Sequence, residues 1–201
     1  MKETIGLISG ILVAVSVIPY AIRTYQRKIR PNAASWSIWT LLGLAILLTY
    51  KSSGATTNIW PAVFGFINPL LITILVLWRG EKHKPTPLEV YCAITGIGSI
   101  ILWWFVQGNK ELSVYALCLA LIADTIAAIP TIIFVWKTPE GDRPFAWGMF
   151  VIAYGIVFFA IKEHTFSNYI LPIYMVVTCS LITFPLIRHR IKNKSPAFDW
   201  I

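Results

Sequence analysis

Seven long apolar stretches, separated by short polar segments, organise this chain. Crossing the hydrocarbon core of a bilayer takes about 17–25 apolar residues, and most of the stretches reach that length. The pattern predicts membrane-spanning helices at residues 5–22, 35–50, 58–78, 88–106, 113–136, 145–162 and 168–187. The second and sixth spans are short, so their ends are the least well defined. The segments between spans are too short for soluble domains, and we expect an all-α membrane protein.

The composition supports a membrane protein and argues against a nucleic-acid-binding or metal-binding protein. Of the residues, 57% are hydrophobic and only 13% are charged, whereas a soluble domain has about 25% charged residues. The net charge of +8 sits in short loops rather than on a folded basic face, so we expect no nucleic-acid partner. The cysteines Cys92, Cys118 and Cys179 lie far apart in apolar stretches, which favours neither disulfides nor a metal site.

The distribution of Lys and Arg predicts the orientation. One side of the membrane receives the segments after spans one, three and five and the tail after span seven. Of the 17 lysines and arginines, this side holds Arg23, Arg27, Lys28, Arg30, Arg79, Lys82, Lys84, Lys137, Arg143, Arg188, Arg190, Lys192 and Lys194. Because basic residues favour the cytoplasmic side, we expect the N-terminus outside and the C-terminus in the cytoplasm, with the protein in the cytoplasmic membrane.

The chain also repeats itself at a distance of 111 residues. Ile18-Pro19 aligns with Ile129-Pro130 without gaps, and other uncommon residues align in the same register. These further pairs are Trp36 with Trp147, Lys51 with Lys162, Pro61 with Pro172 and Arg79 with Arg190. The register predicts two three-helix repeats at residues 1–80 and 112–190, a linker with the fourth span at residues 81–111, and a basic tail at residues 191–201. A single linking span gives both repeats the same orientation.

This 3+1+3 plan resembles the SWEET and PQ-loop transporter superfamily. The paired prolines near the cytoplasmic ends of spans one and five, and the tryptophans at the start of spans two and six, carry the resemblance. The chain has Pro19-Tyr20 and Pro130-Thr131 where the PQ-loop signature has Pro-Gln. The resemblance implies alternating access for a small polar solute, with Pro19 and Pro130 as hinges; a static kink at each proline is the alternative.

Asp124 is the acidic residue that the pattern places deep inside a span. A charge at that depth is costly, so such a residue usually faces a cavity or a partner. The register pairs Asp124 with Val13, so the shared scaffold does not require the acid. We expect a role in substrate binding or proton coupling; a carboxyl group that only holds helices together is the alternative.

Other polar residues near the middle of spans are candidate ligands of the solute. The resemblance implies that an asparagine on the third helix contacts substrate, and Asn68 fits that position, although its register partner is Cys179. Hydrogen bonding between helices is the alternative for Asn68. Tyr154, Tyr174 and Thr178 could line the same cavity.

These observations favour a transporter for a sugar, amino acid or nucleoside-like solute at a midplane site between the repeats. A receptor or sorting protein that binds a ligand without transport, and an assembly partner for other membrane proteins, are alternatives on the same scaffold. The sequence has no cluster of nucleophile, base or metal ligands, so we expect neither an enzyme nor a cofactor or metal. Homodimerisation is left open.

Overall fold

The computed structural model describes residues 1–29, 31–55, 59–79 and 84–201, apart from the side chains of residues 197 and 198. Arg30, Lys82 and the first residue of the third predicted span, at position 58, therefore lie outside the described residues. The rest of each predicted span falls within them.

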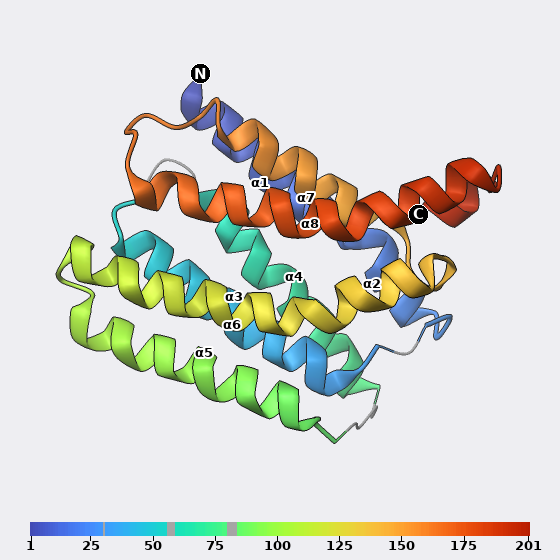
Figure 1. Cartoon of the computed structure of the whole chain (residues 1–201), viewed down its shortest axis with the longest axis horizontal. Helices are drawn as coiled ribbons and strands as arrows, with labels where there is room; N and C mark the ends of the chain where they lie inside the picture. Colours follow the sequence, from blue (N-terminus) through green and yellow to red (C-terminus); the bar gives the residue numbers. More distant parts are fainter. Residues whose placement is uncertain (30, 56–58, 80–83) are drawn as a thin grey trace.

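The described residues form helices and contain no strand (Figure 1). In chain order the elements are α1 (Lys2–Ser16), α2 (Ile18–Tyr25), α3 (Ala33–Ser52), α4 (Ile59–Trp78), α5 (Pro87–Val106), α6 (Lys110–Lys137), the 3₁₀ turn η1 (Pro139–Gly141), α7 (Pro144–Val157), α8 (Phe166–Lys192) and the 3₁₀ turn η2 (Ala197–Trp200). Six spans, with α1 and α2 taken as one, are long and apolar enough to cross a membrane, and α7 is a shorter apolar helix. The chain is a multi-pass helical membrane protein.

Polar residues in the short connections fix where several helices begin. The Asn32 side chain accepts a hydrogen bond from the backbone N–H of Ala34 at 2.9 Å and starts α3. Thr86 and Glu89 form a reciprocal capping box at the start of α5. Such caps satisfy backbone N–H groups that have no partner inside the helix.

Two predicted boundaries need correction. The sixth span was expected to run to residue 162, but α7 ends at Val157 and tighter turns follow it, with hydrogen bonds from Phe159 N to Ile156 O and from Ala160 N to Val157 O. The seventh was expected at residues 168–187, whereas α8 extends from Phe166 to Lys192. In α8, polar end turns continue beyond the apolar part of the helix that hydropathy marks. After α7, the apolar residues 158–161 leave the α-helix, so hydropathy overestimates its length.

The first predicted span is two helices rather than one. α1 ends at Ser16 and α2 begins at Ile18, with Val17 between them. Pro19 lies one residue into α2, and its ring nitrogen cannot donate to the carbonyl group one turn earlier. The break therefore follows from the proline that the sequence singled out.

Six of the described helices form a ring in which each packs against two other members of the ring. In order around the ring these helices are α1, α4, α3, α6, α8 and α7, which packs again on α1. α5 packs outside the ring on α3 and α6 (Figure 1). Small residues allow the closest approaches: a Cβ atom on Gly10 of α1 would lie 2.7 Å from Cβ of Trp60 on α4. Helices in membranes pack closely at such residues.

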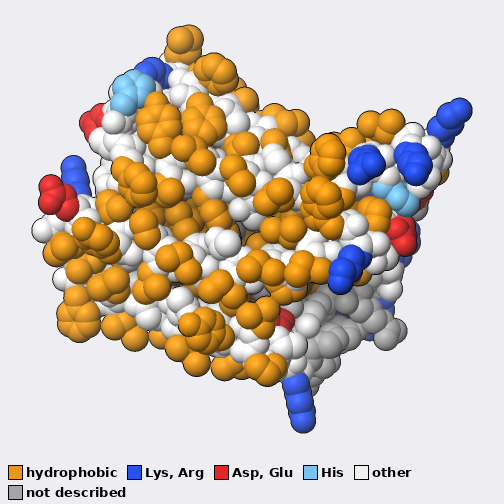
Figure 2. Space-filling model, in the orientation of Figure 1, with side chains coloured by type: hydrophobic (Ala, Val, Ile, Leu, Met, Phe, Trp, Pro, Cys, Tyr) orange, Lys and Arg blue, Asp and Glu red, His pale blue; other side chains and the backbone are white. Residues whose placement is uncertain are grey.

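The surface matches a lipid environment. Hydrophobic side chains cover most of the face drawn in Figure 2, and Lys and Arg gather toward its margins. Along α8, for example, Ile173, Val177, Leu181 and Phe184 are exposed. We call the end of the bundle at which α2, α4, α6 and α8 end the basic end, since most of the described lysines and arginines lie there.

Candidate functional site

Asp124 lies at the middle of the buried face of α6. Successive helical residues are about 100° apart, so Asp124 points away from Ile122 and Ile129, which are exposed on the outer face. Its neighbours on the inner face, Leu117 and Ala120, are fully buried. Asp124 nevertheless keeps partial exposure. Asp124 is thus an ionisable side chain on the inner face of a spanning helix that is not fully enclosed by its neighbours.

Tyr174 of α8 is the hydrogen-bond partner of Asp124. Its hydroxyl group donates to Oδ2 of Asp124 at 2.7 Å, and it also lies against the side chains of Thr125 and Thr178. The structure therefore brings together Asp124, Tyr174 and Thr178, which the sequence named as candidates. Thr125 was missed. Its only sequence signal is its position next to Asp124, and its own hydroxyl donates to the Leu121 carbonyl within α6.

Tyr154 of α7 lies near Asp124, although α7 and α6 are not direct neighbours in the ring. Its side chain is buried, and Asp124, Tyr50 and Cys179 lie within electrostatic range of it. Its hydroxyl oxygen is 3.4 Å from the position that a Cβ atom on Gly65 of α4 would take. The predicted residues Asp124, Tyr154 and Tyr174 thus contribute to one region, from three helices.

Asn68 of α4 is engaged by α1. Its Nδ2 atom donates to the Val13 carbonyl at 2.7 Å and lies 3.4 Å from Oγ of Ser16. The Ser16 hydroxyl donates to the same carbonyl at 2.6 Å. These contacts lie next to the helix break at Val17, where the regular backbone hydrogen bonds of the helix are interrupted. This is the interhelical hydrogen bond that we considered as the alternative, and a ligand role for Asn68 stays a prediction.

The two predicted hinge prolines occupy different structures. Pro19 adjoins the break between α1 and α2. α6, in contrast, is assigned as one helix from Lys110 to Lys137 with Pro130 inside it. The repeat register of 111 residues aligned the two prolines, but Pro19 lies beside a helix break and Pro130 lies inside a continuous helix. The hinge role of each proline stays a prediction.

An aromatic cluster crosses the ring at the basic end. Trp36 lies 5.0 Å from Tyr20 and 5.3 Å from Trp39, measured between ring centroids. Trp39 of α3 in turn meets Trp147 of α7 edge to face at 6.2 Å. Since α3 and α7 stand on opposite sides of the ring, the Trp39–Trp147 contact spans the interior. The sequence analysis missed this contact; the three-residue spacing of Trp36 and Trp39 puts both on one helix face.

Asp142 supports the cluster from the connection between α6 and α7. Its carboxylate accepts hydrogen bonds from Nε1 of Trp147 at 3.0 Å and from the backbone N–H of Arg143 at 2.6 Å. Burial raises the pKa of Asp142 above its ordinary value, although these hydrogen bonds and the charges of Arg190 and Arg143 act in the opposite direction. Desolvation outweighs the favourable contacts.

Comparison of the chain with family models, with curated proteins and with solved structures finds no match. In the part of the chain that the structure describes, no group of three or more His, Cys, Asp or Glu residues could hold a metal ion. The site is therefore described by its own chemistry: one carboxyl group, a phenol that donates to it, two threonine hydroxyls and the surrounding aromatic rings.

Proposed function

We propose that the protein is a transporter that moves a small polar solute through the interior of the helix ring by alternating access. The observation that carries the proposal is the Asp124–Tyr174 pair, which lies at the centre of a buried helix face and keeps partial exposure. Polar and ionisable residues within membrane spans are costly and usually serve a substrate or ion path. Hydroxyl, carboxyl and aromatic groups together suit a sugar, amino acid or nucleoside-like solute.

The helix neighbours support two repeats around a linker helix, with α1–α4 as the first half, α6–α8 as the second, and α5 as the linker. α4 packs between α1 and α3, and α8 packs in the same way between α6 and α7. Between the halves, the α1–α7 contact corresponds to the α6–α3 contact. Exchanging the halves therefore preserves the pattern of neighbours, as expected for parallel repeats about an axis along the membrane normal.

Two arginines in the repeat register support the same proposal. Arg79, which follows α4, donates to the carbonyl oxygen of Tyr25, the last residue of α2 in the same half. Arg190, near the end of α8, donates to Pro139 and Asp142, in the connection after the first helix of the second half. Each arginine ties the last helix of a half to the segment that follows the first.

In this proposal the basic end faces the cytoplasm, because most Lys and Arg lie there. The Trp39–Trp147 contact closes the interior at that end. Release of solute into the cytoplasm then requires these two rings to separate, and the break at Val17 lets α2 move relative to α1. α2 carries Tyr20, which packs on the same aromatic cluster.

Proton coupling is a further part of the proposal. Within the described residues, the hydrogen-bond partner of Asp124 is the neutral hydroxyl group of Tyr174 rather than a cationic side chain. A carboxyl group that releases a proton when the interior opens to one side, and binds one when it opens to the other, would couple solute movement to the proton gradient. A facilitator without coupling would need no such group.

A ligand screen followed by flux measurements tests the proposed function. Sugars, amino acids and nucleosides are added to the purified protein, and a ligand raises its melting temperature because it binds the native state. Compounds that stabilise are then assayed for flux into proteoliposomes, with and without a pH gradient. We expect flux driven by the gradient, lost in Asp124→Asn and retained in Glu111→Gln, which removes a carboxylate from the first turn of the same helix.

The other outcomes favour the alternatives. Stabilisation without flux would indicate a receptor or sorting protein. No stabilisation by any compound and no flux would favour an assembly partner. Flux that Asp124→Asn leaves unchanged would assign Asp124 to helix packing and would indicate a facilitator.

A further inference from the structure

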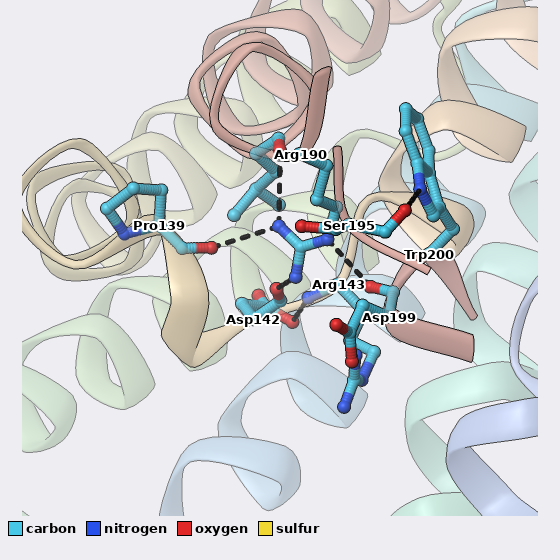
Figure 3. A network of polar contacts seen from close by, with 8 residues as sticks. Pro139, Asp142, Arg143, Arg190, Ser195, Asp199 and Trp200 are labelled. Carbon is cyan, nitrogen blue, oxygen red and sulfur yellow. Dashed lines mark hydrogen bonds and ion pairs between the residues drawn. The ribbon is translucent and has the colours of Figure 1, made fainter. Parts of the chain in front are cut away.

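The segment after α8 folds back on the basic end of the bundle. Lys194 adopts a left-handed conformation with φ of 49°, and the Ser195 N–H donates to the Arg190 carbonyl at 3.0 Å. This is a Schellman-type helix ending, which usually has glycine at the left-handed position. Non-glycine residues adopt this conformation uncommonly, and here it turns the chain back toward the bundle. The 3₁₀ turn η2 follows and lies against the connection between α6 and α7 (Figure 3).

Arg190 is the centre of these contacts. Its side chain is 3% exposed, and it donates from Nε to the Asp199 carbonyl at 2.6 Å and from Nη1 to the Pro139 carbonyl at 3.0 Å. Nη2 donates to the Asp142 carbonyl. One guanidinium group of α8 thus joins the returning segment to the connection between α6 and α7, as Figure 3 shows. A buried guanidinium group needs acceptors for its donors, so loss of the returning segment would leave the Nε donor without its acceptor.

Asp199 links this segment to the start of α7. Its Oδ1 atom lies 3.0 Å from Nη1 of Arg143, and the side chains of Arg143 and Asp199 are 33% and 41% exposed. Asp199 also lies within electrostatic range of Arg23 on α2, which carries the same charge as Arg143. The carboxylate therefore offsets the repulsion between an arginine of the first half and one of the second.

We propose that residues 196–201 act as a strap that holds the basic end of the bundle closed. The strap fixes the connection at residues 139–143 through Arg190 and Arg143. That connection carries Asp142, which positions Trp147 against Trp39 across the ring. Release of the strap frees the connection and weakens the contact between the two tryptophans, so the interior opens at this end. The strap is a regulatory contact whichever solute the interior takes.

Hydrogen–deuterium exchange tests whether the strap holds the connection. Asp199→Asn and Arg143→Gln each remove one partner of the ion pair, and Glu140→Gln removes an exposed carboxylate of η1 as the matched control. We expect amide exchange at residues 139–147 to rise about two- to fivefold in the first two variants, the range that a partly exposed ion pair supports. The double variant should rise no further than the larger single effect. The control should match the parent.

The native Cys179 tests whether the strap also closes the interior. Cys179 is 2% exposed on α8 and lies within electrostatic range of Asp124. In a full-length chain with Cys92→Ser and Cys118→Ser, we expect Asp199→Asn to raise the rate of Cys179 modification by a small water-soluble thiol reagent about two- to fivefold. Glu140→Gln should leave the rate unchanged.

Three results would overturn the proposal. Exchange at residues 139–147 could stay at the parental level in both ion-pair variants. Exchange could rise while Cys179 reactivity stays constant, which would make the segment a surface tether without control of access. Glu140→Gln could raise amide exchange and Cys179 modification as much as Asp199→Asn does. The change in net charge, rather than the loss of the ion pair, would then be the cause. These measurements use no solute, so they can succeed or fail independently of the transport proposal.

Discussion

Single polar side chains in the spans meet specific partners. The Ser9 hydroxyl of α1 donates to the Ala153 carbonyl of α7 at 2.7 Å, Asn68 donates to Val13 of α1, and Tyr174 donates to Asp124. Hydrocarbon offers no hydrogen bonds, so an unpaired polar group there is unfavourable. The Asp124–Tyr174 pair differs from the other two because both of its members are only partly buried.

Asp142 gives a pH prediction at this scale. Its pKa is raised by burial, so between the ordinary aspartate value of about 3.9 and the raised value the folded protein binds more protons than the unfolded chain. The free energy of unfolding therefore falls as the pH rises through this window. Above and below the window, the contribution of Asp142 to the free energy of unfolding does not change with pH. We expect the melting temperature of the parent relative to Asp142→Asn to decrease from about pH 4 upward.

The comparison isolates one group, because the other acidic residues titrate in both proteins. Glu140→Gln, which neutralises an exposed residue of the same connection, should follow the pH profile of the parent. If the difference between the parent and Asp142→Asn does not change with pH, the pKa of Asp142 is not raised in the folded protein.

At the residue level, depth in a span identified side chains that lie close together, and their roles in substrate binding and proton coupling stay predictions. Asp124, Tyr174 and Thr178 were named because each lies near the middle of an apolar stretch, and they meet in the structure. The engagement of Asn68 with α1 could not be derived, because it depends on which carbonyl groups the break at Val17 leaves open. The Arg190 contacts could not be predicted from the sequence either, because they form only when the tail turns back on the connection at residues 139–143.

At the level of helices, Pro185 leaves a backbone carbonyl group without its helical donor, and a side chain of a neighbouring helix bonds to it. Pro185 cannot donate to the Leu181 carbonyl one turn earlier, and Nε1 of Trp136 on α6 donates to it at 2.9 Å. The break near Pro19 has a similar partner in Asn68. Open carbonyl groups thus become contacts between helices, which membrane helices use to tolerate proline. Helix positions were predictable from hydropathy, whereas these partners depend on how neighbouring helices pack.

A double-mutant cycle tests the Pro185 contact. Trp136→Phe removes the indole donor and should lower the free energy of unfolding by about 1 kcal/mol. In a Pro185→Ala background the new backbone N–H can bond Leu181, so the same substitution should cost much less. The measurement is reversible unfolding of the four proteins in bicelles. Strictly additive effects would contradict the account.

Asn68→Leu tests the contact at the helix break. The Val13 carbonyl then loses a donor from α4, and we expect the free energy of unfolding to fall by about 1 kcal/mol. Thr95→Val is the control, since the Thr95 hydroxyl bonds the Tyr91 carbonyl within its own helix and should contribute less. An Asn68→Leu protein as stable as this control would show that the contact adds nothing to folding.

For the whole molecule, the arrangement of helices joins the site to the proposed transport cycle. The ring includes α6, which carries Asp124. The Trp39–Trp147 contact crosses the ring at the basic end, and the Arg190 contacts lie at that end. A multi-pass membrane protein could be predicted from the pattern of apolar stretches together with the composition. The order of helices around the ring could not, because helices that are distant in sequence, such as α1 and α7, become neighbours only through packing.

Orientation is a prediction at this scale. Gly108 lies in the connection between α5 and α6 at the end opposite the basic end, with open space around it, and Glu140 is exposed at the basic end. In a background without native cysteines, an impermeant thiol reagent on intact cells should label Gly108→Cys and leave Glu140→Cys unlabelled until the membrane is opened. The reverse pattern would place the basic end outside.

The central claim is that the interior beside Asp124 opens to each side of the membrane in turn. A cysteine introduced as Thr178→Cys, next to Tyr174, tests it most directly in a chain whose native cysteines are replaced by serine. Oriented vesicles are treated with a water-soluble, impermeant thiol reagent from one side or the other. We expect modification from both sides, with Asp199→Asn raising the rate from the basic end relative to the rate from the other. Modification from one side only, or from neither, would contradict it.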